Sequence, residues 1–162
     1  MDNETHQPNT HHDVPHVKIY PPVVVTATIA FGLLMQFLFP LPVIASSFFR
    51  GIGFMLTIGA MLILWWSDVT FKNVGTHSNP TRATTDLVIT GPHEYSRNPM
   101  YLAFLILTFG IGLWVGTLWL IILDIAQYAI LDYLVVIPEE HYLSRKFGER
   151  YKRYTEKVRR WL

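Results

Sequence analysis

The chain has 162 residues, of which 51% are hydrophobic and 15% are charged, and its formal net charge is +1 at pH 7. This length suits one compact domain, and the apolar excess argues against a soluble globular protein. The chain contains no cysteine, which excludes disulfides, thiolate metal ligands and thiol nucleophiles.

Residues 1–20 are polar and contain four of the seven histidines. We expect a disordered, solvated tail here, because the segment has no apolar run of the kind found in a signal peptide. The histidines have neither regular spacing nor accompanying acids, so we predict no metal site.

The first apolar block runs from Val23 to about Phe39 and the second from about Ile44 to Trp66. Each is long enough to cross a bilayer as a helix, and the Pro-containing segment 39–42 between them is typical of a turn. We therefore predict an N-terminal transmembrane hairpin over residues 21–67.

A third apolar block, residues 100–137, is too long for one crossing. Its glycines cluster around Trp114, which predicts a second hairpin that turns near residues 114–117. The first arm of this hairpin is short, which indicates a tilted or interrupted helix, or one flanked by protein.

Four crossings place both chain ends on one side, and the Lys- and Arg-rich segment 145–160 identifies that side as cytoplasmic. The polar loop 67–99 then faces the cytoplasm as well. The predicted fold is an all-α integral membrane bundle of about four transmembrane helices, followed by a C-terminal amphipathic helix at the membrane interface. The apolar stripe of that helix consists of Leu143, Phe147, Tyr151, Tyr154, Val158 and Trp161.

Unusual polar chemistry is concentrated at residues 87–101, where the polar loop enters the third crossing. Gly91 and Pro92 favour a turn, and Pro99 suits the first turn of a helix. Asn98 can donate and accept hydrogen bonds, as a purine edge or an amino-acid zwitterion requires. The same residues are equally typical of a turn and a helix start at a membrane boundary, with no function in binding.

A second polar group, Pro138-Glu139-Glu140-His141, lies where the fourth crossing reaches the cytoplasm. We expect Pro138 to break or restart the helix. The two carboxylates either stabilise a helix N-terminus or bind ribose hydroxyls and the positive groups of a cofactor.

Asp124 and Asp132 lie within the fourth crossing, where acidic residues are costly and are therefore candidates for function. They support an alternative hypothesis, a small non-catalytic transport or assembly module. For Asp124 we favour a structural hydrogen bond to Gln127, Tyr128 or a neighbouring helix.

The two polar segments together resemble the isoprenylcysteine carboxyl methyltransferase family and its bacterial relatives, which are similar to the phospholipid methyltransferases. The resemblance covers residues 79–162. Its marks are Leu87-Val-Ile-Thr-Gly-Pro-His-Glu-Tyr-Ser-Arg-Asn-Pro-Met-Tyr101, Glu139-Glu-His-Tyr-Leu143, Phe147-Gly-Glu-Arg-Tyr151, Tyr154 and Val158-Arg-Arg160.

The resemblance implies that residues 68–162 form a catalytic region that encloses S-adenosylmethionine, with a lateral opening to lipid. The cofactor contacts that it implies are Thr85, Asp86, Leu87, Val88, His93, Asn98, Pro99, Met100, Tyr101 and Glu139. Arg97 and Glu140 are implied as catalytic neighbours. A neutral amine or hydroxyl acceptor would require a proton acceptor, for which Glu140, His93 and His141 are candidates.

The sequence departs from the eukaryotic carboxyl methyltransferases at Val135, where those enzymes have an anion-binding arginine. We therefore do not carry over prenylcysteine as the substrate. We expect a methyltransferase in the inner membrane of a bacterium, with both termini and the cofactor site cytoplasmic. Its expected partners are the bilayer and a lipophilic small molecule rather than nucleic acid.

Overall fold

The computed structural model describes residues 17, 19–42, 46–76, 79 and 84–162. The predicted N-terminal tail lies almost entirely outside these residues. Within the described part, the only β-pairing is an isolated bridge between Pro42 and Thr117. The elements in chain order are α1 (Pro21–Leu38), α2 (Ser47–Val74), the 3₁₀ turn η2 (Gly91–Glu94), α3 (Pro99–Val115), α4 (Leu118–Leu131), the π-helical segment η3 (Asp132–Val136), α5 (Ile137–Phe147) and α6 (Glu149–Lys157).

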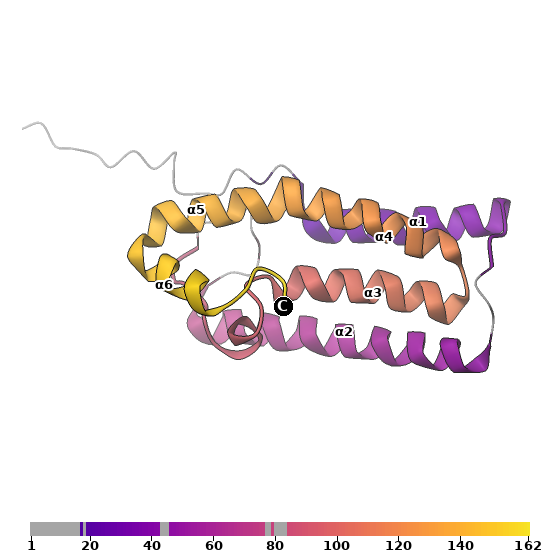
Figure 1. Ribbon diagram of the computed structural model, residues 1–162, viewed down its shortest axis with the longest axis horizontal. Helices are drawn as coiled ribbons and strands as arrows, with labels where there is room; N and C mark the ends of the chain where they lie inside the picture. Colours follow the sequence, from indigo (N-terminus) through magenta and orange to yellow (C-terminus); the bar gives the residue numbers. More distant parts are fainter. Residues whose placement is uncertain (1–16, 18, 43–45, 77–78, 80–83) are drawn as a thin grey trace, which may run out of the picture.

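Three helical spans have the length and apolar composition needed to cross a membrane, namely Pro21–Leu38, Ser47–Val74 and Leu118–Phe147. The apolar helix α3 is shorter, with 17 residues, as the sequence predicted for the first arm of the second hairpin. The four helices run side by side as a bundle (Figure 1). The predicted all-α membrane bundle is thus confirmed, and the chain is an integral membrane protein.

Helices α2 and α3 pack closely along their lengths (Figure 1). A methyl group added at Gly53 on α2 would lie 2.6 Å from the carbonyl oxygen of Gly110 on α3. Small residues at a membrane helix interface allow this backbone approach, in which van der Waals contact replaces the hydrophobic driving force. The α2–α3 pair is therefore the rigid support on which the segment between the two helices is held.

The turns at one end of the bundle are joined by polar contacts. Gly116 adopts the left-handed conformation (φ 81°) and ends α3, and Thr117 begins α4, so the predicted turn is confirmed. The Thr117 hydroxyl donates to the Gln36 side chain of α1 (2.9 Å), and the Trp119 indole donates to the Phe39 carbonyl (2.7 Å). The two hairpins are thereby tied together at this end.

Helix α2 continues to Val74, well beyond the predicted end at Trp66. Its last turn carries Lys72, and Gly75 ends it in the left-handed conformation (φ 76°), which is the common C-terminal arrangement of helices. The polar residues after Trp66 belong to this helical extension, and two of them, Ser67 and Thr70, are buried against the rest of the protein. The predicted boundary at residue 67 therefore falls inside a helix.

Pro138 does not break the fourth crossing, but it lies in the first turn of α5, where α-helical geometry restarts after η3. Helices α4 and α5 form one continuous rod through η3 (Figure 1). In η3 the amide of Ile137 donates to the carbonyl of Asp132, five residues earlier. This wider turn accommodates the proline, which has no amide hydrogen and whose ring would clash with a regular helical turn.

The chain reverses direction at Gly148 (φ 49°, ψ −124°), so the predicted apolar stripe is divided between α5 and α6. Its members Tyr151 and Tyr154 are buried against Leu87 of the polar loop, with Leu143, Phe147 and Val158 around them. The stripe thus forms an internal wall at the end of the bundle.

Candidate functional site

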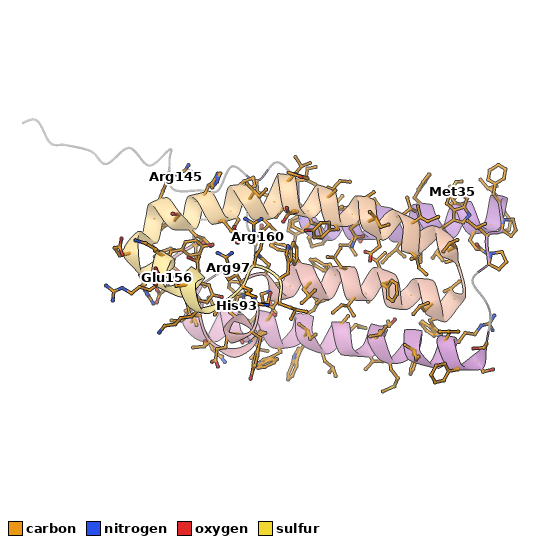
Figure 2. All side chains as sticks on the ribbon, viewed as in Figure 1. Met35, His93, Arg97, Arg145, Glu156 and Arg160 are labelled. Atoms are coloured by element: carbon orange, nitrogen blue, oxygen red, sulfur yellow. The ribbon has the colours of Figure 1, made fainter. Side chains whose placement is uncertain are left out.

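Most of the polar residues singled out from the sequence lie at the end of the bundle where α2 and α5 end and α3 begins. Figure 2 shows His93, Arg97 and Arg160 together there, while Met35 on α1 lies near the opposite end. Residues far apart in the chain meet here because α3 and α4 form a hairpin, which returns residue 139 to the level of residue 101.

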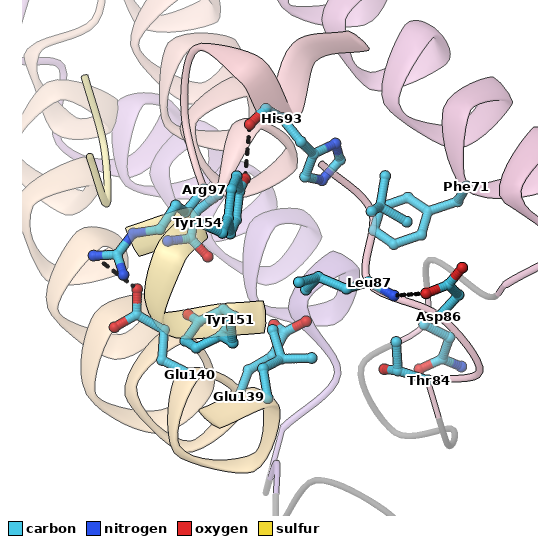
Figure 3. A pocket seen from close by; sticks show the side chains of 14 residues that line it. Phe71, Thr84, Asp86, Leu87, His93, Arg97, Glu139, Glu140, Tyr151 and Tyr154 are labelled. Atoms are coloured by element: carbon cyan, nitrogen blue, oxygen red, sulfur yellow. Dashed lines mark hydrogen bonds and ion pairs between the residues drawn. The ribbon is translucent and has the colours of Figure 1, made fainter. Parts of the chain in front are cut away.

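A cleft lies between the polar loop, the start of α3, and α5 and α6 (Figure 3). Its main part encloses about 50 Å³ and a second part about 30 Å³, and both are bordered by His93, Arg97, Asn98 and Glu139. The main part is also lined by Phe71, Asn79, Thr84, Asp86, Leu87, Val88, Glu140, Leu143, Tyr151 and Tyr154. The second part is also lined by Phe71, Pro99, Met100 and Tyr101.

The structure thus brings together the predicted site residues except Thr85 and the candidate proton acceptor His141, which line neither part of the cleft. The Thr85 hydroxyl donates to the Gly75 carbonyl (3.2 Å), and its amide donates to the Thr76 hydroxyl (3.1 Å). Thr85 therefore fastens the loop to the end of α2, and its neighbour Thr84 lines the cleft.

Gly91 allows the loop to approach α2 closely. It adopts a positive φ of 62°, and a methyl group added there would lie 2.8 Å from the Thr70 hydroxyl. The following turn is fixed from the other side, because the Tyr154 hydroxyl donates to the His93 carbonyl (2.7 Å). The η2 turn is thus held between α2 and α6.

His93 is 6% exposed, and its ring meets the ring of Phe71 edge-on at a centroid distance of 5.0 Å. Burial lowers the pKa of His93 to about 4, because desolvation penalises the charged imidazolium. The ring is therefore neutral at pH 7. Its Nδ1 atom is buried and makes no hydrogen bond within the described residues, so it is available to a bound molecule.

Glu139 faces the cleft from the first turn of α5, opposite the start of α3. Its Oε2 atom accepts a 2.6 Å hydrogen bond from the Tyr101 hydroxyl, and Tyr101 is 8% exposed. The other carboxylate oxygen of Glu139 takes no part in this bond. The Glu139 carboxylate is thus anchored to α3 and still borders the cleft.

Glu140 lies between two guanidinium groups. Arg160 donates to its Oε2 atom from Nη2 (2.7 Å) and Nε (3.1 Å), and Arg97 Nη2 lies 3.3 Å from its Oε1 atom. Arg160 also pairs with Asp132 at 3.8 Å. Val135, which stands where the eukaryotic carboxyl methyltransferases have an arginine, is completely buried in the same apolar cluster as Tyr101. The positive charges next to Glu140 belong to Arg97 and Arg160.

Asp86 borders the cleft at its exposed side. The backbone amide of Leu87 donates to Asp86 (2.7 Å), and Arg150 of α6 pairs with it at 2.6 Å. These two contacts lower the pKa of Asp86 below its usual value, since both stabilise the carboxylate. The pair also links the loop to α6.

The sequence interpretation did not assign Phe71, Thr84, Leu143, Tyr151 or Tyr154 to the site. The three- and four-residue spacing of Leu143, Phe147, Tyr151 and Tyr154 gave a signal for one buried face. Gly75, preceded by Lys72, gave a signal that α2 extends far enough to bring Phe71 to the cleft. Nothing local in the sequence distinguished Thr84 from Thr85.

A family model described as phospholipid methyltransferase matches residues 49–150, which is more than half of the chain. The chain belongs to this family. The match confirms the resemblance and extends it into α2, where the sequence motifs gave no indication. It also shows that the protein is a membrane methyltransferase in general terms.

An uncharacterized protein of Haemophilus influenzae is 40% identical over 69 residues, which cover 39% of this chain and all of that protein. No solved structure matches.

The intramembrane acids differ from expectation. Gln127 is fully buried, but its partners are the Thr108 hydroxyl (3.1 Å) and the Phe104 carbonyl (3.3 Å) of α3. Asp124 Oδ1 is buried without a hydrogen-bond partner in the described part of the chain. The structural hydrogen bond that we favoured for Asp124 is thus not formed at that atom.

Proposed function

We propose that this protein transfers a methyl group from S-adenosylmethionine to a lipophilic or membrane-accessible small substrate at this cleft. Membership of the phospholipid methyltransferase family supports methyl transfer. The observation that carries the assignment to the cleft is the meeting of Asn98 with Glu139 and Glu140, which come from opposite arms of the second hairpin and border one enclosed space.

The side chains of the cleft suit a cofactor with an aromatic base, hydroxyl groups and positive charge. Leu87, Val88 and Phe71 offer apolar surface to a base, and Glu139 offers an acceptor for hydroxyls and favourable electrostatics for cations. Three buried polar atoms of residues that border the cleft, His93 Nδ1, Arg97 Nε and Glu140 Oε1, lack hydrogen-bond partners in the described residues. Buried polar atoms are normally satisfied, so these atoms support the presence of a polar ligand.

When bound, S-adenosylmethionine supplies an electrophilic methyl group on a sulfonium. The protein would align the acceptor atom with the methyl group and keep water out of the cleft. These two effects account for a large part of the acceleration of a displacement reaction. The buried wall formed by Leu87, Tyr151 and Tyr154 keeps water from one side of the cleft.

Among the expected proton acceptors, His141 does not border the cleft, and His93 is a weak candidate. Its pKa of about 4 makes it a poor base at neutral pH. Arg160 holds one oxygen of Glu140 by hydrogen bonds and Arg97 pairs with the other at 3.3 Å, which suits a fixed anion that orients other groups. A substrate that needs no base, or one that loses its proton to water, fits these residues best.

The enclosed space of about 50 Å³ is far smaller than the roughly 300 Å³ or more of a typical ligand site. Cofactor binding therefore requires a wall to move. The wall best placed for this is α6, because it is joined to α5 through the single residue Gly148 and contacts the loop partly through the exposed pair Arg150–Asp86.

We place this end of the bundle in the cytoplasm of a bacterium, at the inner membrane. The basic residues of α5, α6 and the C-terminal segment support this orientation through the excess of Lys and Arg in cytoplasmic segments. A cytoplasmic cleft would have direct access to a soluble methyl donor, and the acceptor would enter from the adjoining lipid.

Calorimetric titration of the detergent-solubilised protein with S-adenosylhomocysteine tests the proposal. We expect saturable binding that is lost when Glu139→Ala and Asn98→Ala are combined. Glu156→Ala is the matched control, since this exposed α6 carboxylate lies outside the cleft. Undiminished binding by the double variant, or no binding by folded wild-type protein, would refute the assignment.

The alternative, a transport or assembly module, is favoured by one observation, the unpartnered Asp124 Oδ1 in the membrane. Asp132 gives it less support because it is paired with Arg160. A reconstituted flux that disappears in the Asp124→Asn, Asp132→Asn variant would support this alternative, and the absence of any flux would dismiss it.

A further inference from the structure

The C-terminal segment, residues 158–162, leaves α6 and returns to the start of α3 (Figure 1). Its backbone forms hydrogen bonds with the residues that precede α3. The Arg97 amide donates to the Arg159 carbonyl (3.0 Å), and the Ser96 hydroxyl donates to the Arg160 carbonyl (3.3 Å). This segment is therefore joined by hydrogen bonds to Arg97, which borders the cleft, and to its neighbour Ser96.

The Arg160 carbonyl also determines how Asn98 is oriented. It accepts a 3.1 Å hydrogen bond from the Asn98 side-chain nitrogen, and Asn98 is 7% exposed. This bond uses one of the two N–H groups of the amide. Within the described residues, the side-chain oxygen of Asn98 accepts no hydrogen bond, and Asn98 borders both parts of the cleft.

The Arg160 side chain acts on the other arm of the hairpin. Its guanidinium holds Glu140 through two hydrogen bonds and pairs with Asp132. The next residue, Trp161, packs against the apolar core and stacks at an angle on Tyr128 of α4, with ring centroids 5.3 Å apart. Arg160 thus connects the start of α3 with η3 and α5, and its neighbour Trp161 fixes it against α4.

We propose that Arg160 is a positioning residue of the methyltransferase site. Its carbonyl fixes the Asn98 amide so that the oxygen is presented to the bound molecule, while its guanidinium fixes Glu140. Asn98 therefore presents its oxygen to an N–H donor of the ligand, such as an amino or ammonium group. This inference rests on the proposed function and specifies how one of its contacts is made.

A double-mutant cycle with S-adenosylhomocysteine as the probe tests the backbone part. The four proteins are the full chain, a chain that ends at Val158, Asn98→Ala, and the combination of the last two. We expect the shortened chain and Asn98→Ala each to raise the Kd about tenfold, the effect of one lost hydrogen bond to a buried group. The combination should also raise it about tenfold, since the loss of residues 159–162 is expected to weaken binding through the Asn98 side chain.

An isosteric variant covers the case in which the shortened chain does not fold. Asn98→Asp keeps an oxygen toward the cleft but has no donor for the Arg160 carbonyl. If Arg160 positions this side chain, we expect the Kd to rise about tenfold although the ligand-facing oxygen remains. If Asn98 binds without help from Arg160, the aspartate will bind an N–H donor at least as tightly as asparagine does.

The side-chain part is tested by Arg160→Ala and Arg160→Lys, with Lys157→Ala as a control that removes an exposed cation from the end of α6. Arg160→Ala retains the carbonyl, so we expect the Kd for S-adenosylhomocysteine to change less than threefold while kcat falls at least tenfold. Arg160→Lys should recover only part of kcat, because lysine lacks the planar, bidentate geometry. Lys157→Ala should match the wild type.

A Kd unchanged in both the shortened chain and Asn98→Asp would overturn the positioning role while leaving the proposed function intact. Multiplicative effects of the shortened chain and Asn98→Ala would do the same. Equal losses of kcat in Arg160→Ala and Lys157→Ala would overturn the side-chain part. Failure of the wild-type protein to bind S-adenosylhomocysteine would overturn the proposed function and this inference together.

Discussion

The Tyr101 hydroxyl donates a 2.6 Å hydrogen bond to the Glu139 carboxylate and thereby joins the first turn of α3 to the first turn of α5. Both residues border the narrower part of the cleft. The bond sets the spacing between the two arms of the second hairpin at the level where the ligand is proposed to bind.

Replacing Tyr101 by Phe should leave a buried carboxylate without its hydrogen bond. We expect a loss of about 1–3 kcal/mol in the free energy of unfolding and weaker binding of S-adenosylhomocysteine. Thermal denaturation in detergent and calorimetry measure the two effects. Tyr133→Phe is the control, since Tyr133 is 68% exposed; equal effects of the two variants would mean that the bond to Glu139 has no special importance.

His93 should make the stability of the protein depend on pH. Its pKa falls from 6.5 to about 4 on folding, so the unfolded chain binds more protons between these pH values. The free energy of unfolding should therefore be independent of His93 protonation above pH 6.5. It should fall by about 3 kcal/mol as the pH falls from 6.5 toward 4. Melting temperatures from pH 7.5 to 4.5 should fall less steeply in His93→Gln, and parallel curves would contradict the prediction.

The sequence was sufficient to predict the membrane helices and the second hairpin turn, because apolar length and glycine position depend only on local composition. It was also sufficient to predict most of the cleft, since the two polar segments lie at the ends of a hairpin whose arms must meet. The extension of α2 was missed because its residues after Trp66 are polar, and polarity was taken as the end of the helix.

The path of the chain after Lys157 was not predictable by such reasoning. The stripe spacing suggested that the helix continues to Trp161, whereas the backbone carbonyls of Arg159 and Arg160 bind the residues before α3. Backbone carbonyls have no sequence signature, and these contacts join residues more than sixty positions apart. The π-helical turn before Pro138 was not predicted for a related reason, since such a turn has no recognisable local pattern.

The close packing of α2 and α3 predicts opposite results for two neighbouring glycines. Gly53→Ala should cost about 1–3 kcal/mol in unfolding free energy, because the added methyl group would press on the Gly110 carbonyl. Gly59→Ala places its methyl group in open space and should be neutral or slightly stabilising. Thermal denaturation of both variants measures this; similar melting temperatures would contradict the packing.

The reversal at Gly148 should be required for α6 to reach the cleft. Its backbone conformation (φ 49°, ψ −124°) favours glycine, so Gly148→Ala should strain the turn by about 1–3 kcal/mol. We expect α6 to dock less well and the Kd for S-adenosylhomocysteine to rise. Gly51→Ala, also open to added volume, is the control, and identical Kd values for the two variants would show that the turn is not needed.

The central claim is tested most directly by following a labelled methyl group. The purified protein in membrane vesicles is incubated with S-adenosylmethionine that carries an isotopic methyl label, and lipids, small amines and thiols are then analysed by mass spectrometry. We predict label in a lipophilic or membrane-accessible small molecule, and its loss in the Glu139→Ala, Asn98→Ala protein. No labelled product from folded wild-type protein, or equal labelling by the double variant, would contradict the account.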